Sequence, residues 1–204
     1  MAKRLGFGQV EPNHLSARYT GQIYAQLPAK DSSGNAITQL ENGQFLKYDY
    51  ANARACNSAN VAGEWMLVFN EEKLYDERHQ NHKDFVLKNT DFTDGLIYPR
   101  LLKINVGDIF TTNTFKSSGT PATVTSLDKE ITLPDIKVDD YVVIGSDGWL
   151  TKWTASDNET APASGIVFKV VPHFSQSYNS TDRVWEPDYT LPDGQWAAKL
   201  QRVM

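Results

Sequence analysis

The sequence predicts a mainly β protein, built as an antiparallel β-sandwich or barrel. About eight to ten short apolar segments follow one another at close spacing, and no helical segments alternate with them. This pattern favours antiparallel sheets over βαβ units. In addition, one arrangement of a short apolar segment, a polar turn and an apolar strand occurs three times.

The recurring arrangement occupies residues 40–50, 104–110 and 136–144. Its first copy reads LENGQFLKYDY. Asn42-Gly43 predicts a tight turn there, because Gly adopts positive φ without cost and Asn tolerates it. The residues that follow are rich in aromatics, as half-buried strands are. We interpret the polar residues of the three copies as equivalent turn residues rather than catalytic acids. They are Asn42, Gly43, Gly107, Asp108, Asp139 and Asp140.

The chain divides into three parts. Residues 1–30 carry scattered apolar residues broken by Gly and Pro, which predicts an extended N-terminal arm. Such an arm either lies across another surface or wraps its own barrel. Residues 31–171 form the predicted β-domain. Prolines interrupt residues 172–204, which predicts an irregular C-terminal tail in which only residues 195–203 suit a short helix.

Several segments inside the β-domain have clear patterns. Residues 63–69, GEWMLVF, are almost continuously apolar and predict a strand that is buried on both faces. Residues 70–83 are highly charged and predict a short helix or a structured surface loop. Residues 149–153, WLTKW, alternate as a half-buried strand does. Residues 165–171, GIVFKVV, predict the last strand of the domain.

Composition bounds the class of partner. The net charge is -5 over 204 residues, so the chain has no overall basic footprint for nucleic acid. No apolar segment follows the basic start as in a signal peptide, and the longest apolar runs of about five residues are too short to cross a bilayer. We therefore expect a protein made in a cytoplasm, with neither nucleic acid nor membrane as its partner. The single cysteine, Cys56, excludes an internal disulfide, and we interpret it as an incidental thiol.

No motif in the chain indicates a catalytic site, a metal site or a cofactor. His79 and His82 are three residues apart and would share a helix face with Glu77 nearby, but HExxH spacing is absent. We therefore expect these histidines to be exposed or structural, and a metal-dependent enzyme built on them is the weakest alternative.

Aromatic residues offer a different kind of site. Tyr141, Trp149 and Trp153 are close enough in sequence to form a strip on which a sugar would stack. Burial in a core or an interface is the simpler interpretation of the same residues. A glycan-binding module of a virion or another surface stays open as an alternative function.

The first half of the chain resembles a known group of proteins. Residues 63–72, GEWMLVFNEE, after the first turn-and-strand copy, are similar to small β-rich head proteins of tailed bacteriophages, of the capsid decoration or head-fibre type. The opening MAKRLGFG and the segment SARYTGQIYAQL at residues 16–27 also resemble the arm that precedes the β-domain in such proteins. The C-terminal tail has no counterpart in this resemblance.

The resemblance implies a non-enzymatic virion protein, made in the host cytoplasm. Such a protein would bind the shell of the major capsid protein as a homo-oligomer and stabilise it. Apolar and aromatic residues of the two terminal segments would then anchor it to its partners. These residues are Leu5, Phe7, Leu15, Tyr19, Tyr24, Trp185, Tyr189 and Trp196.

Overall fold

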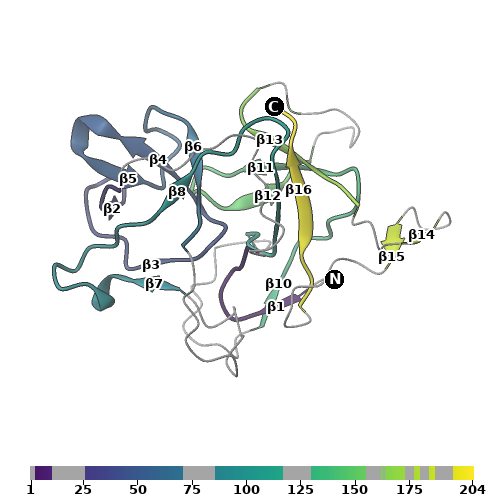
Figure 1. Ribbon diagram of the computed structural model, residues 1–204, viewed down its shortest axis with the longest axis horizontal. Coiled ribbons are helices and arrows are strands. Elements are labelled where there is room, and N and C mark those ends of the chain that lie inside the picture. The colour runs from purple at the N-terminus through teal and green to yellow at the C-terminus, as the bar shows by residue number, and fades with distance from the viewer. Residues whose placement is uncertain are drawn as a thin grey trace.

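The protein is mainly β, as the sequence predicts (Figure 1). The computed structural model describes residues 3–10, 26–70, 86–116, 130–154, 162, 164–172, 177–179, 184–186 and 195–204. Its strands are β1 (Lys3–Leu5), β2 (Ala29–Lys30), β3 (Gln39–Leu40), β4 (Phe45–Asp49), β5 (Arg54–Cys56), β6 (Trp65–Val68), β7 (Leu87–Lys88), β8 (Leu101–Leu102), β9 (Ile109–Thr112), β10 (Glu130–Thr132), β11 (Tyr141–Ile144), β12 (Leu150–Lys152), β13 (Val167–Val170), β14 (Ser177–Asn179), β15 (Val184–Glu186) and β16 (Ala198–Arg202). The short 3-10 helices among the described residues are η2 (Tyr50–Asn52) and η4 (Asn89–Asp91).

Two five-stranded sheets organise the fold. The first sheet has the order β2-β5-β4-β6-β8, and the second has the order β12-β11-β13-β16-β9. All neighbouring strands within them are antiparallel except β2 and β5, which are parallel. Figure 1 shows the first sheet in the left half of the molecule and the second in the right half. The remaining strands form the pairs β1–β10, β3–β7 and β14–β15.

The second sheet curls into a half-barrel. After β9 the chain crosses to the opposite edge, where Phe115 forms a parallel bridge with Leu150 of β12. The backbone N–H of Lys116 then donates to the carbonyl of Leu150 at 2.8 Å. This crossing gives the β12 edge a hydrogen-bonding partner, which an exposed edge strand lacks.

The first sheet lies between two hydrophobic cores. Phe45, Phe110 and Phe168 meet in the core that it shares with the second sheet, with ring centroids 5.3 to 6.2 Å apart. The opposite face packs a second core that contains Leu46 and Ile97. Because side chains alternate along a strand, a sheet between two cores needs apolar residues at successive positions.

Strand β6 shows this double burial. Leu67 packs in the shared core, whereas Met66 and Val68 pack in the second core. The predicted strand with two buried faces is therefore confirmed.

The beginning of the chain packs on its own domain. Strand β1 pairs with β10, and Val10 forms an antiparallel bridge with Thr112. Phe7 and Val10 are buried, each 4% exposed. Of the two alternatives for the arm, the structure places residues 3–10, called the N-terminal strap below, against this chain's own strands.

The end of the chain is a strand rather than a helix. Strand β16 lies between β13 and β9 in the second sheet, so the expected short helix at residues 195–203 is wrong. Ala198 and Leu200 are buried, and the residues between and after them are half-exposed, which is the alternation of a strand. Ala, Lys, Leu and Gln favour helices locally, but pairing on both sides of β16 overrides that preference. Residues 198–202 therefore belong to the β-domain and not to an irregular tail. The segment at residues 71–85 lies outside the described residues.

The three predicted turns share one geometry. They span residues 41–44, 105–108 and 137–140, and the fourth residue of each donates its N–H to the first residue's carbonyl at 3.3, 3.0 and 3.1 Å, respectively. The fourth side chain accepts a hydrogen bond from the first residue's N–H at 2.9, 2.7 and 2.7 Å. The third residue has positive φ in every copy. These residues are Gly43 at 96°, Gly107 at 95° and Asp139 at 75°.

Candidate functional site

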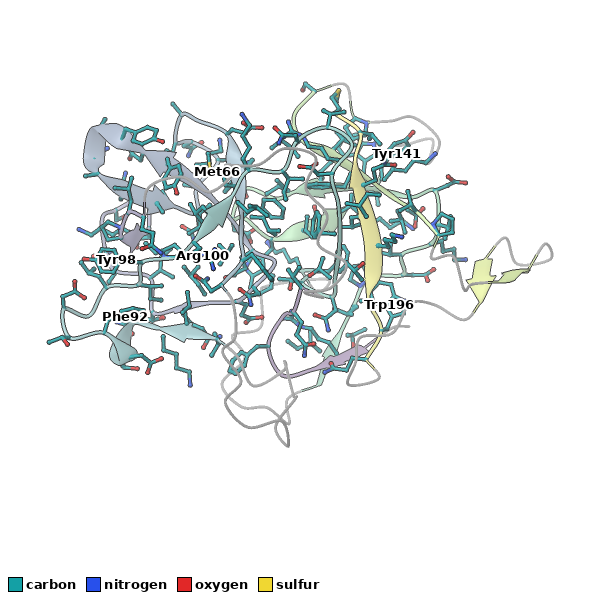
Figure 2. The ribbon with its side chains drawn as sticks, viewed as in Figure 1. Met66, Phe92, Tyr98, Arg100, Tyr141 and Trp196 are labelled. Carbon is teal, nitrogen blue, oxygen red and sulfur yellow. The ribbon has the colours of Figure 1, made fainter. Side chains whose placement is uncertain are left out.

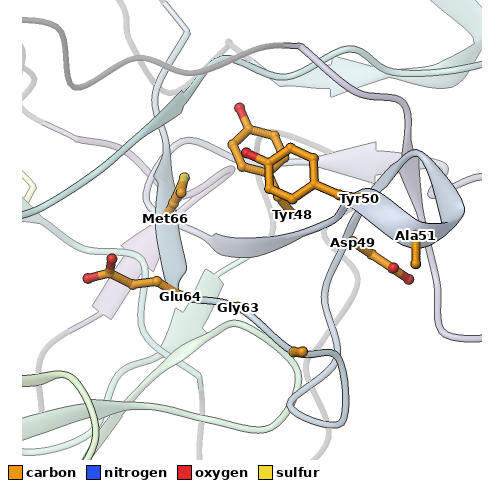
Figure 3. A pocket seen from close by; sticks show the side chains of 8 residues that line it. Tyr48, Asp49, Tyr50, Ala51, Gly63, Glu64 and Met66 are labelled. Carbon is orange, nitrogen blue, oxygen red and sulfur yellow. The ribbon is translucent and has the colours of Figure 1, made fainter.

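A shallow pocket of about 360 Å³ opens at the far end of β4 (Figure 3). It lies between the 3-10 helix η2 and the loop that leads into β6. Figure 2 shows that Met66, on its floor, belongs to the first sheet's half of the molecule. The pocket is lined by Tyr48, Asp49, Tyr50, Ala51, Ala62, Gly63, Glu64 and Met66.

Two tyrosines give the pocket its aromatic character. The rings of Tyr48 and Tyr50 lie 5.5 Å apart at an interplanar angle of 31°. Tyr48 is 4% exposed and Tyr50 is 67% exposed, so one ring supports the other from below. Burial raises the pKa of the Tyr48 phenol to about 12, with a smaller contribution from Tyr50. The pair therefore offers a firm, neutral surface to another molecule.

The position of Tyr50 follows from the end of β4. The Asp49 carboxylate accepts a hydrogen bond from the backbone N–H of Asn52 at 3.3 Å and caps the first turn of η2. Ala53 then takes a left-handed conformation, with φ of 47°, and ends that turn. The side-chain amide of Asn52 also holds the pKa of Asp49 below its usual value, together with Arg54.

Both carboxylates of the pocket are ion-paired. Asp49 pairs with Arg54 at 2.8 Å, and Glu64 pairs with Arg202 at 2.7 Å and with Lys103 at 3.0 Å. Burial disfavours the charged form of Glu64, but the two cations outweigh it and keep its pKa below the usual value. These acids stabilise the walls, and the opening between them is neutral and apolar.

Lys47 holds the loop that leads into β6 and forms one side of the pocket. Its ammonium group donates to the carbonyls of Ala59 at 3.1 Å and Val61 at 3.0 Å, and it lies 4.8 Å from the centre of the Trp65 ring. Burial lowers the pKa of Lys47. The N–H of Ala59 also donates to the carbonyl of Ser146, between β11 and β12. The pocket is therefore preformed on both sides.

A second aromatic surface lies on the second sheet. Trp153, the residue after β12, donates its backbone N–H to the carbonyl of Tyr141 in β11 at 2.8 Å, so the two residues are neighbours. Trp153 is 38% exposed. Ion pairs flank them, Lys169 with Asp139 at 2.9 Å and Lys152 with Asp140 at 2.7 Å.

The third residue of the predicted sugar strip is used elsewhere. The guanidinium of Arg4 lies 5.4 Å from the centre of the Trp149 ring. The structure therefore brings Tyr141 and Trp153 together and engages Trp149 with the N-terminal strap.

A buried polar cluster fastens the N-terminal strap. The Arg4 guanidinium pairs with the Glu41 carboxylate at 3.3 Å, and their side chains are 1% and 3% exposed. Glu41 also accepts from the N–H of Gly8, and Asn113 accepts from the N–H of Gln9 at 2.9 Å. Burial lowers the pKa of Arg4, and Glu41 partly restores it. Sequence reasoning missed this pair because nothing in the local pattern distinguishes Arg4 or Glu41 from a surface charge.

The residues predicted to bind partners have different locations. Phe7 is a correction: it packs against Ile131 inside the chain, so it offers no surface to a partner. Trp196 is half-buried against the shared core, with its ring 6.0 Å from that of Phe115. Leu5 lies in β1 and Trp185 in β15. The others, Leu15, Tyr19, Tyr24 and Tyr189, lie outside the described residues.

The described parts of the chain contain no group of three His, Cys, Asp or Glu residues that could hold a metal ion. Glu77, His79 and His82, the predicted alternative, lie outside those parts. Cys56 is a buried free thiol in β5.

Sequence reasoning also missed the Tyr48–Tyr50 pocket. The available signal is the YDY spacing at the end of the first turn-and-strand copy, which by itself indicates only a half-buried strand. No helix within the described ranges is long and apolar enough to cross a membrane. Comparisons with protein-family models, with curated proteins and with solved structures find no match to this chain.

Proposed function

We propose that this chain is a non-enzymatic structural protein of a virion, which binds a capsid shell and stabilises it. The observation that carries the proposal is the preformed pocket around Tyr48 and Tyr50. An exposed aromatic ring that is supported by a buried one, beside an apolar floor, is typical of the anchoring positions in protein–protein interfaces.

The charges around the pocket favour a protein partner. A catalytic site needs an acid or base that is free to exchange protons, whereas Asp49 and Glu64 are both held in ion pairs. A sugar site needs convergent polar groups beside its aromatic ring. With the carboxylates occupied, the pocket suits an apolar or aromatic side chain.

The shell as partner follows from the resemblance to phage head proteins. A shell repeats one surface many times, so a protein with a modest contact site gains avidity when several copies bind together. The rigid β-core and the internally packed N-terminal strap suit such a protein, since they keep the contact site in one fixed geometry.

The test is co-sedimentation with empty shells, assembled from the major capsid protein of the virus to which we propose that this chain belongs. We expect the wild-type protein to sediment with the shells and to raise their melting temperature. Tyr50→Ala should weaken binding about 30-fold, which corresponds to the loss of an interface anchor worth about 2 kcal/mol.

Tyr98→Ala is the matched control, because Tyr98 is another exposed tyrosine and lies outside the pocket. It should bind as the wild type does. Wild-type protein that stays in the supernatant at every concentration would contradict the proposal.

The second aromatic surface supports a second candidate function, glycan binding. Tyr141 at the start of β11 and Trp153 just after β12 are backbone neighbours with charged groups next to them, and sugars bind to such combinations of aromatic and polar groups. A glycan array should then give a signal that Trp153→Ala removes and Tyr50→Ala keeps. An array without signal for the wild type ends this candidate.

A further inference from the structure

The lining of the Tyr48–Tyr50 pocket combines an exposed aromatic ring with small side chains. Tyr50 is 67% exposed, whereas Met66 on the floor is 8% exposed. Figure 3 shows Met66 and Glu64 on one side of the tyrosine rings and Asp49 on the other. The rest of the lining is small, namely Ala51, Ala62 and Gly63. A flat, rigid apolar group therefore has a ring to pack against and small neighbours that leave room for it.

The place of the pocket in the fold bears on how a peptide is able to bind there. Strand β4, which carries Tyr48, lies between β5 and β6 in the first sheet. A peptide that adds a strand to a sheet needs an edge strand, and β4 is an interior strand. A helix inserts side chains from successive turns into a long groove, whereas this lining comes from two short stretches, residues 48–51 and 62–66. An extended segment that needs no backbone pairing fits better than either.

A proline-rich segment meets these conditions. Its polyproline II conformation has no internal hydrogen bonds, and proline has no backbone N–H that would need a partner on an apolar surface. The conformation is formed before binding, so little conformational entropy is lost, which favours binding to a shallow pocket. Aromatic-lined sites are the usual recognition sites for such segments.

Tyr50 adds a hydrogen-bond donor to this surface. Its phenol O–H is able to donate to a backbone carbonyl, and the carbonyls of a polyproline II segment are open to solvent and to other molecules. Asp49 caps η2 and Ala53 ends it, so the backbone that carries Tyr50 is fixed in position. The ring and its hydroxyl therefore offer an apolar and a polar contact in one geometry.

The charges of the lining select against an acidic ligand. Asp49 and Glu64 are the charged residues of the lining, and the cations that pair with them lie outside it. Because the carboxylates are already paired, they do not require a cation in the pocket. They are nevertheless the charges closest to a bound segment, and like charges brought together weaken binding.

The proline-bearing segment of this chain does not fit that requirement. Residues 186–193, EPDYTLPD, contain two prolines together with the acids Glu186, Asp188 and Asp193. Binding this segment would bring further carboxylates to the two in the lining. The occupant that fits is therefore a segment of another protein.

We propose that the Tyr48–Tyr50 pocket binds a proline-rich, extended segment of the partner protein, and that this segment is free of acidic residues. The inference rests on the proposed function, in that it names the kind of segment by which the partner enters the pocket. Proline rings pack on Tyr50 and beside Met66, and the Tyr50 hydroxyl donates to a carbonyl of the segment.

Nuclear magnetic resonance of the isotope-labelled, full-length protein tests the site without any shell. The probe is a peptide of eight prolines between two arginines, titrated at low ionic strength. We expect saturable shifts of the backbone amides of residues 48–51 and 62–64. Tyr50→Ala should weaken binding at least about 10-fold. Tyr50→Phe keeps the ring and should weaken it about 5-fold, the loss of one hydrogen bond.

Matched controls separate the site from general stickiness. Tyr98→Ala removes an exposed tyrosine outside the pocket and should bind the peptide as the wild type does. A glycine–serine peptide between two arginines should cause no saturable shift, and eight prolines between two glutamates should bind more weakly. The inference is overturned if the wild type shows no saturable shift, if the glycine–serine peptide binds equally well, or if Tyr50→Ala binds like the wild type.

The peptide and shell experiments fail in different ways. A wild type that sediments with shells but does not bind the proline peptide overturns this inference and supports the proposed function. A wild type that binds the peptide through Tyr50 but does not bind shells supports the inference about the pocket and contradicts the shell as partner. Displacement of the wild type from shells by the peptide supports both.

Discussion

The first and third turns, at residues 41–44 and 137–140, have the same backbone hydrogen bonds and opposite surroundings. In the first, Glu41 is buried beside Arg4, and Gly43 lies against the side chain of Thr114. In the third, Asp139 takes the position of Gly43, with its side chain 80% exposed and paired with Lys169. One local geometry therefore serves as a buried anchor in one place and as a surface corner in the other. The difference teaches that the turn residues determine where the chain bends, whereas the surrounding packing determines how much the turn contributes to the stability of the fold.

Removing the buried cation of the first turn, Arg4, should cause the largest loss of stability. Arg4→Met leaves the Glu41 carboxylate buried without its partner, so we expect the free energy of unfolding to fall by about 4 kcal/mol. Urea unfolding followed by tryptophan fluorescence measures it. Lys169→Met removes the corresponding cation from the exposed third turn and should cost less than about 1 kcal/mol.

A double variant separates the buried charge from lost packing. Arg4→Met combined with Glu41→Gln keeps an acceptor for the N–H of Gly8 and removes the uncompensated charge. It should recover most of the stability lost in Arg4→Met. Equal losses in Arg4→Met and Lys169→Met would mean that the two turns do not differ in the way described.

Adding one methyl group to the first turn should have the next largest effect. Gly43 has φ of 96°, and a Cβ there would overlap the side chains of Thr114 and Thr112. Gly43→Ala should therefore lower the free energy of unfolding by about 3 kcal/mol, from backbone strain and overpacking together. Gly165→Ala is the matched control, because its φ of 93° is similar and a Cβ there meets nothing within 4 Å.

The control isolates the conformational cost. Gly165→Ala should cost about 1 kcal/mol, the price of a left-handed alanine alone. If both variants lose the same amount in the same urea experiment, the close packing of the first turn contributes nothing.

Tyr48, on the strand that follows the first turn, should make the free energy of unfolding depend on pH in the alkaline range. The pKa of Tyr48 is about 12 in the folded protein, against about 10 in an unfolded chain. The native state therefore keeps a proton that the unfolded state loses between these values. This contribution to stability is complete below pH 10 and disappears as the pH rises through 12, a loss of about 2 kcal/mol at pH 12.

Tyr48→Phe removes the ionising group and serves as the control. Its unfolding free energy should be flatter between pH 10 and 12 than that of the wild type, when both are measured by urea unfolding. Parallel curves for the two proteins would show that Tyr48 ionises like an exposed tyrosine.

The smallest effect is expected at the third turn. Asp139→Gly relieves a left-handed conformation at a residue other than glycine, worth about 1 kcal/mol, and removes an exposed ion pair worth less than that. Glycine also adds freedom to the unfolded chain, so the changes nearly cancel. We expect a net change within about 0.5 kcal/mol by urea unfolding. A loss above 2 kcal/mol would mean that the third turn is an anchor like the first.

The candidate site was less predictable than the fold. Tyr48 and Tyr50 are adjacent to a turn that the sequence marks clearly, but the pocket also needs Glu64 and Met66, which a separate loop and strand bring to it. The role of Arg4 depends on Glu41, which lies far along the chain. No local pattern encodes contacts of this kind.

The sequence by itself determined the mainly β class, the three turns and the doubly buried strand β6. These features depend on short-range physics: positive φ at Gly43, alternation of side chains, and continuous apolar character over residues 65–69. Only the tertiary structure decided that residues 198–202 form a strand, because pairing with β13 and β9 outweighs their helical preference. It also decided that Phe7 faces inward and that one turn is buried while its equivalent is exposed. Each of these outcomes depends on which distant residues a segment meets, and on the free energy that burial adds there.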